Sequence, residues 1–237
     1  MKKTLFILYL FSTLCYSQTL KGIITQNPMA GIGDETELSE KAKKAMYYAY
    51  TFSNRISLQE LISKEETSVD TVMVEHPEIK DLKKGSIMVN IRSTKTIYYK
   101  DYNTNVYRFE SSRKNRYLIT ENTSIKDEIP IYNWILEDKS QTIAGYLCKK
   151  AKTERTLFGR KQYIIAWYCE DLPINDGPMD FNGLPGLILQ IEIGNINIIK
   201  FEKLKFLKDE NTTIDEPVNQ SPMLNISQYE RKVLYGN

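Results

Sequence analysis

The chain has 237 residues, of which 41% are hydrophobic and 26% are charged, and its formal net charge is +2. These proportions are typical of a folded globular chain, so they exclude an intrinsically disordered or fibrous protein. A single histidine also disfavours acid/base or metal chemistry that is built on histidine.

The first seventeen residues have the layout of a secretory signal peptide. Two lysines precede an apolar run over residues 5–14, and a small residue ends the segment. We therefore expect residues 1–17 to be removed and the protein to be exported through the inner membrane, to the periplasm, the outer membrane or the medium. Lipidation at Cys15 is the less favoured alternative, because Leu14 is larger than the small residue that lipoprotein processing prefers.

Removal of this segment makes the chain formally neutral, with 30 basic and 30 acidic residues. A neutral chain has no long-range attraction to nucleic acid or to an anionic membrane. No later apolar stretch approaches the length needed to cross a bilayer. We thus expect no nucleic-acid partner and no transmembrane segment in the exported chain, and the sequence does not fix the oligomeric state.

The pattern along the chain predicts one N-terminal helix followed by many short strands. After a strand at 20–25, the stretch 34–45 begins with an acid at the N-cap position, has Glu37 three residues later and carries lysines near its end. It is the clearest helix signal in the chain. The next expected strands are 46–52, 57–62, 68–75, 86–91, 95–101, 105–111, 116–120 and 132–136.

Short strands without helices between them indicate an antiparallel meander. The expected fold is mainly β, with one curved antiparallel sheet or a partly open barrel or bowl over residues 18–208. Within it, 187–193 alternates apolar and polar residues and turns into 196–207. Residues 209–237 are expected to be a polar tail with a short helix at 226–234.

Two cysteines remain after cleavage, Cys148 and Cys169, and export permits a disulfide. The stretches 142–152 and 162–168 are strand-like, with a Gly-containing turn expected at 158–159. Such a turn pairs residues whose numbers add up to 317, as 148 and 169 do, so the two sulfur atoms would face each other. We expect this disulfide, with two buried thiols as the alternative.

The most distinctive motifs lie between this hairpin and the last strand pair. They are Ala166-Trp167-Tyr168, Leu172-Pro173-Ile174, Asp176-Gly177-Pro178 and Gly183-Leu184-Pro185-Gly186-Leu187-Ile188. Together with 145–151 and Trp134-Ile135, they resemble the GLPGLI family of exported Bacteroidota proteins over about 134–192. The resemblance implies an exported β-rich domain similar to the bowl-like N-terminal domain of certain secreted peptide N-glycosidases, and it transfers no catalytic residue.

The residues of the last motif predict a structural role first. Pro185 fixes φ at about −65° and Gly186 tolerates positive φ, so 184–187 favours a type II turn. Pro173 and Pro178 interrupt strand pairing upstream, which makes the whole connection a rigid crossing loop.

The alternative interpretation of this loop is a recognition surface, because aromatic side chains on a stiff backbone bind with little loss of entropy. The candidate binding residues are Trp167, Tyr168, Phe181 and Asn182. The tyrosine-rich segments 47–50 and 98–102 are a second candidate wall. For these segments a plain sheet role is favoured, because tyrosine is common in strands.

The acidic residues of the loop do not form a convincing chemical site. Asp171, Asp176 and Asp180 lack the spacing of an EF-hand, and Asp is a common turn residue. Glu170 and Asp171 would point to opposite faces of a strand, which is unsuitable for a pair of hydrolytic carboxyl groups. His76 is interpreted as a surface turn residue. We therefore predict no catalytic residue, no metal and no cofactor.

These observations favour a non-catalytic exported binding module, in the envelope or secreted. Its curved sheet would present an aromatic concave surface to a peptide, a glycan or an envelope protein. The alternative is a hydrolase acting on glycan or peptide, or an accessory domain of one, which the resemblance suggests. A pocket with two acids would favour hydrolysis, and an open aromatic groove would favour binding.

Overall fold

The computed structural model of the protein describes residues 19–29, 43–64, 68–75, 83–90, 92–115, 117–207, 212–218 and 222–236. The expected signal peptide, Cys15 and His76 lie outside these ranges.

The described residues fold mainly into β-strands, as the sequence predicts. The strands are β1 (Thr19–Pro28), β2 (Met46–Ser53), β3 (Ile56–Leu61), β4 (Ser68–Glu75), β5 (Lys83–Asn90), β6 (Ser93–Asp101), β7 (Val106–Lys114), β8 (Thr120–Glu128), β9 (Ile135–Ile143), β10 (Tyr146–Leu157), β11 (Arg160–Cys169), β12 (Leu187–Ile193), β13 (Asn197–Leu207) and β14 (Met223–Leu224). A helix, α2 (Ile226–Tyr235), follows the last strand.

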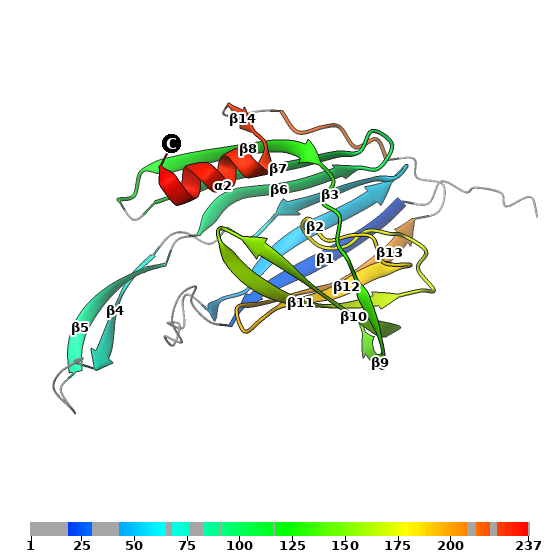
Figure 1. Ribbon diagram of the computed structural model, residues 1–237, viewed down its shortest axis with the longest axis horizontal. Helices are drawn as coiled ribbons and strands as arrows, with labels where there is room; N and C mark the ends of the chain where they lie inside the picture. The colour runs from blue at the N-terminus through cyan, green and yellow to red at the C-terminus, as the bar shows by residue number, and fades with distance from the viewer. Residues whose placement is uncertain are drawn as a thin grey trace, which may run out of the picture.

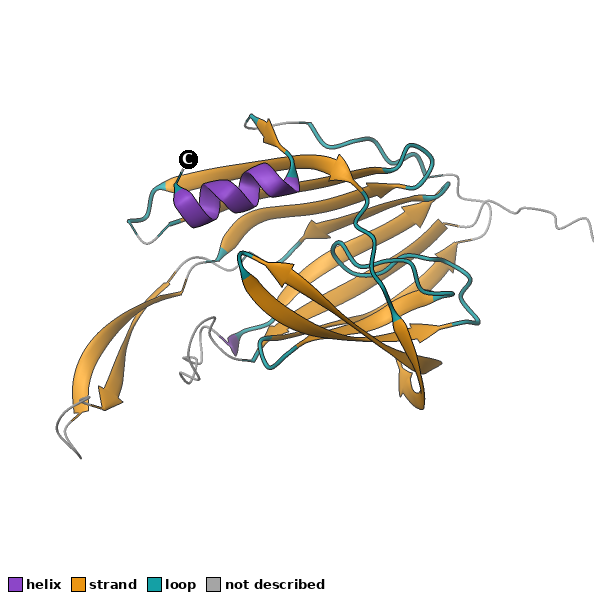
Figure 2. Ribbon diagram, viewed as in Figure 1, coloured by secondary structure: helices purple, strands orange, loops and turns teal. Residues whose placement is uncertain are grey.

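Twelve of these strands form one strongly curved sheet (Figure 1, Figure 2). Their order across the sheet is β14-β8-β7-β6-β3-β2-β1-β13-β12-β11-β10-β9. The remaining pair, β4 and β5, forms a separate hairpin that projects away from the large sheet in Figure 1. The large sheet is not closed into a barrel, because β14 and β9 are its two edges. It is mixed rather than purely antiparallel, because β14 runs parallel to β8.

Most neighbouring strands are consecutive in the sequence, as a meander requires. The main departure is β1, which pairs with β13 along its whole length, from Thr19↔Leu207 to Pro28↔Asn197. This long-range pairing joins the N-terminal and C-terminal parts of the sheet. Residues 129–134 then lead from β8, near one edge of the sheet, to β9 at the other.

The predicted N-terminal helix over 34–45 requires a correction. Residues 34–42 lie outside the described ranges, and of the remaining three only Lys43 is helical. The helix that the structure describes is instead α2 at the C-terminus, where the sequence predicts one over 226–234. Its N-cap Asn225 takes part in a reciprocal capping box, which explains why it begins there.

Strand prediction succeeds where the apolar pattern is strong and fails where it is weak. The strand β12 has the predicted bounds, and its alternate apolar residues are buried. A strand predicted over 116–120 is in fact β8, which begins at Thr120. Because Ile125 is the one apolar residue of β8, this strand offers no apolar period to detect.

The hairpin of β10 and β11 has the predicted turn and register. Phe158 and Gly159 have φ values of 50° and 70°, as a type I′ turn requires, and paired residue numbers add up to 317. The stretch 142–152, which the sequence assigns to one strand, is divided by a second tight turn at 144–145 between β9 and β10.

The loop between β11 and β12 does not contain the predicted type II turn. The N–H of Gly186 donates to the carbonyl oxygen of Leu184 at 2.8 Å, which closes a three-residue turn around Pro185. The φ of Gly186 is 157°, whereas a type II turn needs about +80°. Gly186 is required for another reason, because a Cβ there would lie 2.1 Å from the carbonyl oxygen of Cys169.

We expect Gly186→Ala to lower the free energy of unfolding by about 3 kcal/mol or more, because the backbone of β11 must move to admit the Cβ. Urea unfolding followed by tryptophan fluorescence measures the change. The control is Gly159→Ala, where a Cβ meets nothing within 4 Å. Only the positive φ opposes this substitution, so the free energy of unfolding should fall by about 1 kcal/mol. Equal losses in the two variants would contradict the close-contact explanation.

Candidate functional site

A buried ion pair fastens the loop between β11 and β12 to the sheet. Asp176 is fully buried, and its carboxylate is paired with the ammonium group of Lys100 in β6. The hydroxyl groups of Tyr50 and Tyr102 donate to the same carboxylate at 2.5 and 2.7 Å. We call the face of the sheet that carries Lys100 and Tyr50 the inner face.

The loop surrounds the Lys100 ammonium with acceptors. Besides its pairing with Asp176, the ammonium group donates to the carbonyl oxygen atoms of Gly177 and Phe181 at 2.8 and 3.1 Å. A buried charge is tolerated when its hydrogen-bonding groups are satisfied, as they are here. Burial and the Asp176 charge hold the pKa of Tyr50 well above its usual 10, so the phenol remains a protonated donor to the carboxylate.

A second charged pair lies further along the same loop. Asp180 accepts from Arg155 of β10 at 2.7 Å and from the hydroxyl of Tyr132 at 2.5 Å. The guanidinium also lies 4.9 Å from the ring centre of Phe181, which is a cation–π contact. Both charged side chains remain 19% exposed, whereas the Lys100 pair is buried, so this second pair is accessible to a ligand.

The Arg155–Asp180 pair lines a cavity of about 240 Å³ beneath α2, and a second cavity of about 170 Å³ adjoins it. Aromatic side chains from separate strands and from the β10–β11 turn line the two cavities. We call these residues the aromatic groove: Tyr48, Tyr98, Tyr107, Phe109 and Phe158. The rings of Tyr98 and Phe109 line both cavities, with their centres 5.1 Å apart.

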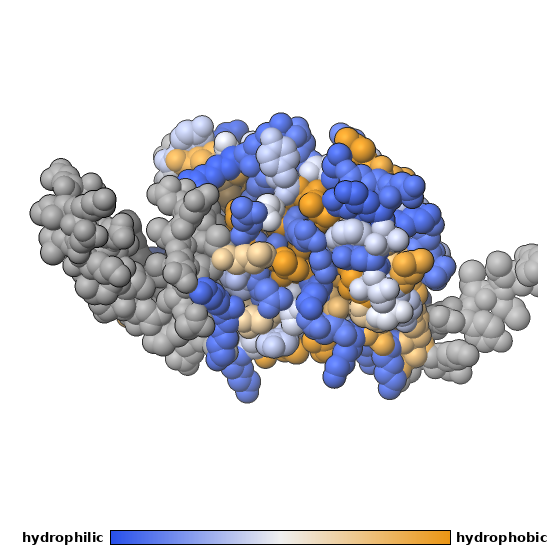
Figure 3. All heavy atoms as spheres, turned by 90° about the horizontal axis from the view of Figure 1, so that it is seen from below, coloured by the Kyte–Doolittle hydropathy of each residue, from blue (hydrophilic) through white to orange (hydrophobic). Residues whose placement is uncertain are grey.

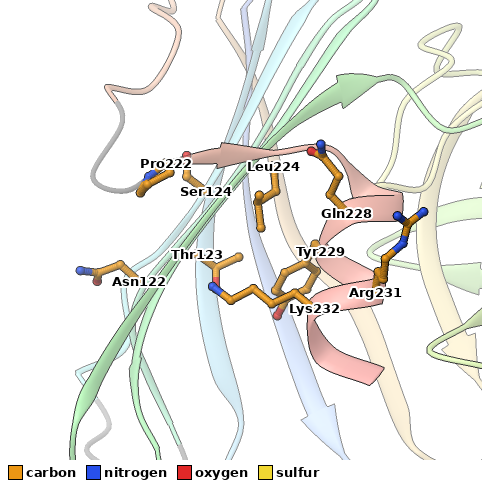
Figure 4. A pocket seen from close by; sticks show the side chains of 9 residues that line it. All are labelled: Asn122, Thr123, Ser124, Pro222, Leu224, Gln228, Tyr229, Arg231 and Lys232. Carbon is orange, nitrogen blue, oxygen red and sulfur yellow. The ribbon is translucent and has the colours of Figure 1, made fainter. Parts of the chain in front are cut away.

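The helix α2 covers this groove without filling it. Tyr229 lines both cavities and also a third, of about 490 Å³, between α2 and β8. Figure 4 shows Tyr229 and Lys232 reaching from α2 toward β8, whereas Arg231 points away. No residue of α2 is fully buried. The helix therefore contacts the sheet through few side chains.

The four residues predicted to form a recognition surface do not share one exposed face. Phe181 and Tyr168 are 0% and 1% exposed and belong to the hydrophobic core. Asn182 is buried and donates to the carbonyl oxygen of Pro130, which ties the loop to the segment between β8 and β9. Trp167 is partly exposed, and its indole N–H donates to a glutamate of β12. A binding role for these residues stays a prediction.

The motif at 183–188 packs the loop against the sheet. Leu184, Leu187 and Ile188 are buried in the core, and Gly183 and Pro185 are exposed. The three aspartates of the loop also have separate surroundings, since Asp171 is exposed, Asp176 binds Lys100 and Asp180 binds Arg155.

The predicted disulfide is not formed in this structure, where Cys148 and Cys169 are both free and buried. The two residues lie one step beyond the last paired residues of the ladder, Lys149↔Tyr168. They are nine steps from Leu157↔Arg160, the pair that closes the turn. This odd number places them at a non-hydrogen-bonded position, where opposed side chains are closest. Burial and the neighbouring Cys169 raise the pKa of the Cys148 thiol to about 12.

Sequence reasoning missed the residues that the fold brings together from a distance. Lys100 and Asp176 lie in different parts of the chain, and no local pattern connects them. The tyrosine-rich segment 98–102 was the available signal for the groove. Tyr98 of this segment packs against the core and lines the cavities, and a ligand-stacking role for it stays a prediction.

Another cavity, of about 250 Å³, lies outside the aromatic groove, and its lining includes Phe52 and Tyr102. The face seen in Figure 3 mixes hydrophilic and hydrophobic side chains and shows no continuous apolar patch. Among the residues that the structure describes, no helix is long and apolar enough to cross a membrane. The aromatic groove is therefore the candidate site that the geometry supports best.

A family model matches one short segment of the chain. The model is described as "Protein of unknown function (Porph_ging)", and it matches residues 157–190, from the β10–β11 turn into β12. The resemblance to the GLPGLI family is not confirmed by this match. No curated protein sequence matches the chain.

Two solved structures of PNGF-II, in the C2 and P21 space groups, are similar to this protein. The TM-scores are 0.52 and 0.50, and the sequence identities are 14% and 13%. Each comparison covers 92% of this chain but only 33% or 34% of PNGF-II, so the chain spans about a third of that protein's length. At this identity the likeness shows a shared fold.

The buried ion pair leads to a test of how the loop is held. Lys100→Met should lower the free energy of unfolding by about 3–5 kcal/mol, because the Asp176 carboxylate then remains buried without its cation. The matched control is Lys149→Met, because the partner of Lys149, Glu170, is 45% exposed. This variant should change stability little. Chemical denaturation measures both. A small effect in both variants would show that the ion pair does not hold the loop.

Proposed function

We propose that the protein is a non-catalytic, exported binding module whose aromatic groove holds a peptide, a glycan or a partner protein. The observation that carries this proposal is the groove itself, where aromatic side chains gather around cavities that α2 leaves unfilled. Rings already fixed by a sheet lose little entropy on binding. The exposed part of the Arg155–Asp180 pair adds a polar contact beside them.

The acids of the groove favour binding over hydrolysis. Within the described residues, Asp180 and Glu230 line the cavity beneath α2. Asp180 is paired with Arg155, and Glu230 accepts from the N–H of Phe158 at 3.1 Å. General acid–base catalysis needs a carboxyl group that can exchange a proton with the substrate. Both carboxylates are held by donors of the protein itself, which supports the binding role proposed here.

Export is the second part of the proposal. It is supported by the lysine pair and apolar run of residues 1–17. An exported protein meets oxidising conditions, in which a pair of neighbouring thiols forms a disulfide. We therefore propose that Cys148 and Cys169 are bonded in the exported protein.

Crosslinking of the tagged protein in its own cells, followed by purification and mass spectrometry, tests the binding function. Phe109→Ala removes one ring of the groove and should lower the yield of a dominant partner about tenfold or more, as the loss of a central aromatic contact does. Tyr163→Ala is the matched control, because this tyrosine of β11 is 65% exposed. The control should leave the yield unchanged.

A third variant, Trp167→Ala, examines the recognition surface predicted from the sequence. If this variant alone loses the partner, the binding site lies around Trp167 and not in the groove. A partner retained by both Phe109→Ala and Trp167→Ala would refute the groove as the site.

The proposed disulfide is tested by alkylation of the exported protein. Cys148 and Cys169 should stay unmodified when the protein is denatured without reductant, and both should react after reduction. Mass spectrometry of the intact chain reads out the number of labels, and Cys148→Ser, which leaves one free thiol, calibrates the labelling. Complete labelling without reductant would show that the two thiols remain reduced.

A further inference from the structure

One side chain of α2 reaches into the aromatic groove. The ring of Tyr229 in α2 lies edge-on to the ring of Phe158, with their centres 5.8 Å apart. Tyr229 also lines the 170 Å³ cavity together with Tyr98 of β6 and Phe109 of β7. An aromatic side chain is therefore the group that this groove receives.

A carboxylate beside that ring meets a backbone donor. The N–H of Phe158 donates to Oε1 of Glu230 at 3.1 Å. Phe158 is the first residue of the two-residue turn between β10 and β11. The N–H groups of central turn residues take no part in the hydrogen bond that closes a β-turn, so this donor is available to an acid.

The helix is fixed at its start and loosely packed along its length. The N–H of Ile226 donates to Oδ2 of Asp127 at 2.9 Å, and Asn225 and Gln228 form the capping box. A permanent part of a core packs at the density of an organic crystal. In contrast, α2 has no fully buried residue, and a cavity of about 490 Å³ remains on its β8 side. This is the packing of a segment that can be displaced.

We propose that α2 is an internal ligand of the groove, and that the external partner is a peptide segment that presents an aromatic residue followed by an acidic one, as Tyr229-Glu230 does. The inference rests on the proposed binding function and names its ligand class. A tethered segment has a high effective concentration, in the millimolar range for a short flexible linker. An external peptide must therefore displace α2, and the chain tunes its own affinity.

A synthetic peptide of residues 222–236 with an N-terminal fluorophore is the probe, and fluorescence anisotropy measures its binding to the full chain. The variant Tyr229→Ala/Glu230→Gln weakens the seating of the chain's own helix. The peptide should bind this variant about tenfold more tightly than the wild type, because the competing state is removed. The matched control is Tyr235→Ala, whose side chain is 72% exposed in the last turn of the same helix. The control should bind the peptide as the wild type does.

A second peptide tests the chemistry of the ligand. It carries Ala at the positions of Tyr229 and Glu230 and should bind at least about tenfold more weakly, since it lacks the anchor and the acid. Adding Phe109→Ala to the double variant should abolish the gain in affinity. Equal affinity of the wild type and the double variant, or equal binding of the two peptides, overturns the proposal. If the double variant fails to fold, Glu230→Gln alone replaces it, with the same direction expected.

The result also separates this inference from the proposed function. A partner captured in cells and lost in Phe109→Ala, with no peptide binding in either protein, would retain the groove as a binding site and reject the aromatic–acidic peptide as its ligand. If Phe109→Ala retains the partner and neither protein binds the peptide, the groove is rejected as a binding site altogether.

Discussion

The ion pair between Lys100 and Asp176 is the constraint on which the inner face depends. It connects β6 to the loop after β11, and these lie in different parts of the sheet. Tyrosine hydroxyl groups and loop carbonyl groups satisfy both charges, and these contacts hold the loop against the inner face, with Phe181 in the core. The same position sets Asp180 beside the groove. The contact that stabilises the loop thus also determines where the groove has its polar side.

The inner face is covered in two different ways. The loop between β11 and β12 is tightly packed, since Asp176, Phe181 and Leu184 are at most 1% exposed. The helix α2 lies over β7 and β8 with cavities on its sides and contributes no fully buried residue. Tight packing makes a permanent layer, whereas incomplete packing leaves a helix that few contacts hold in place. The fold therefore combines a fixed cover and a replaceable one on a single sheet.

Local residue patterns predicted the parts of the fold that local residues determine. The bounds of β12, the turn between β10 and β11 and the position of α2 follow from alternation, positive φ and helix capping. The polar strand β8 has no such signal and was misplaced. The tyrosine-rich segments 47–50 and 98–102 contain Tyr48 and Tyr98 of the groove, but their meeting with Phe109 and Phe158 could not be predicted, because these residues are distant in the sequence. The burial of Phe181 could not be predicted either, because an aromatic residue looks the same in a sequence whether it faces solvent or core.

The contact between Gly186 and the Cys169 carbonyl lies within the segment that the family model matches, residues 157–190. A Cβ at Gly186 would lie 2.1 Å from that carbonyl oxygen, so glycine is the residue that fits there. Strands such as β6 and β7 need only a suitable alternation, which many sequences supply. A sheet of this kind can keep its shape while most of its residues change, as it does between this chain and PNGF-II at 14% identity. In such a protein a recognisable sequence motif can mark a point where two backbone segments are in close contact, while the residues of the binding surface vary.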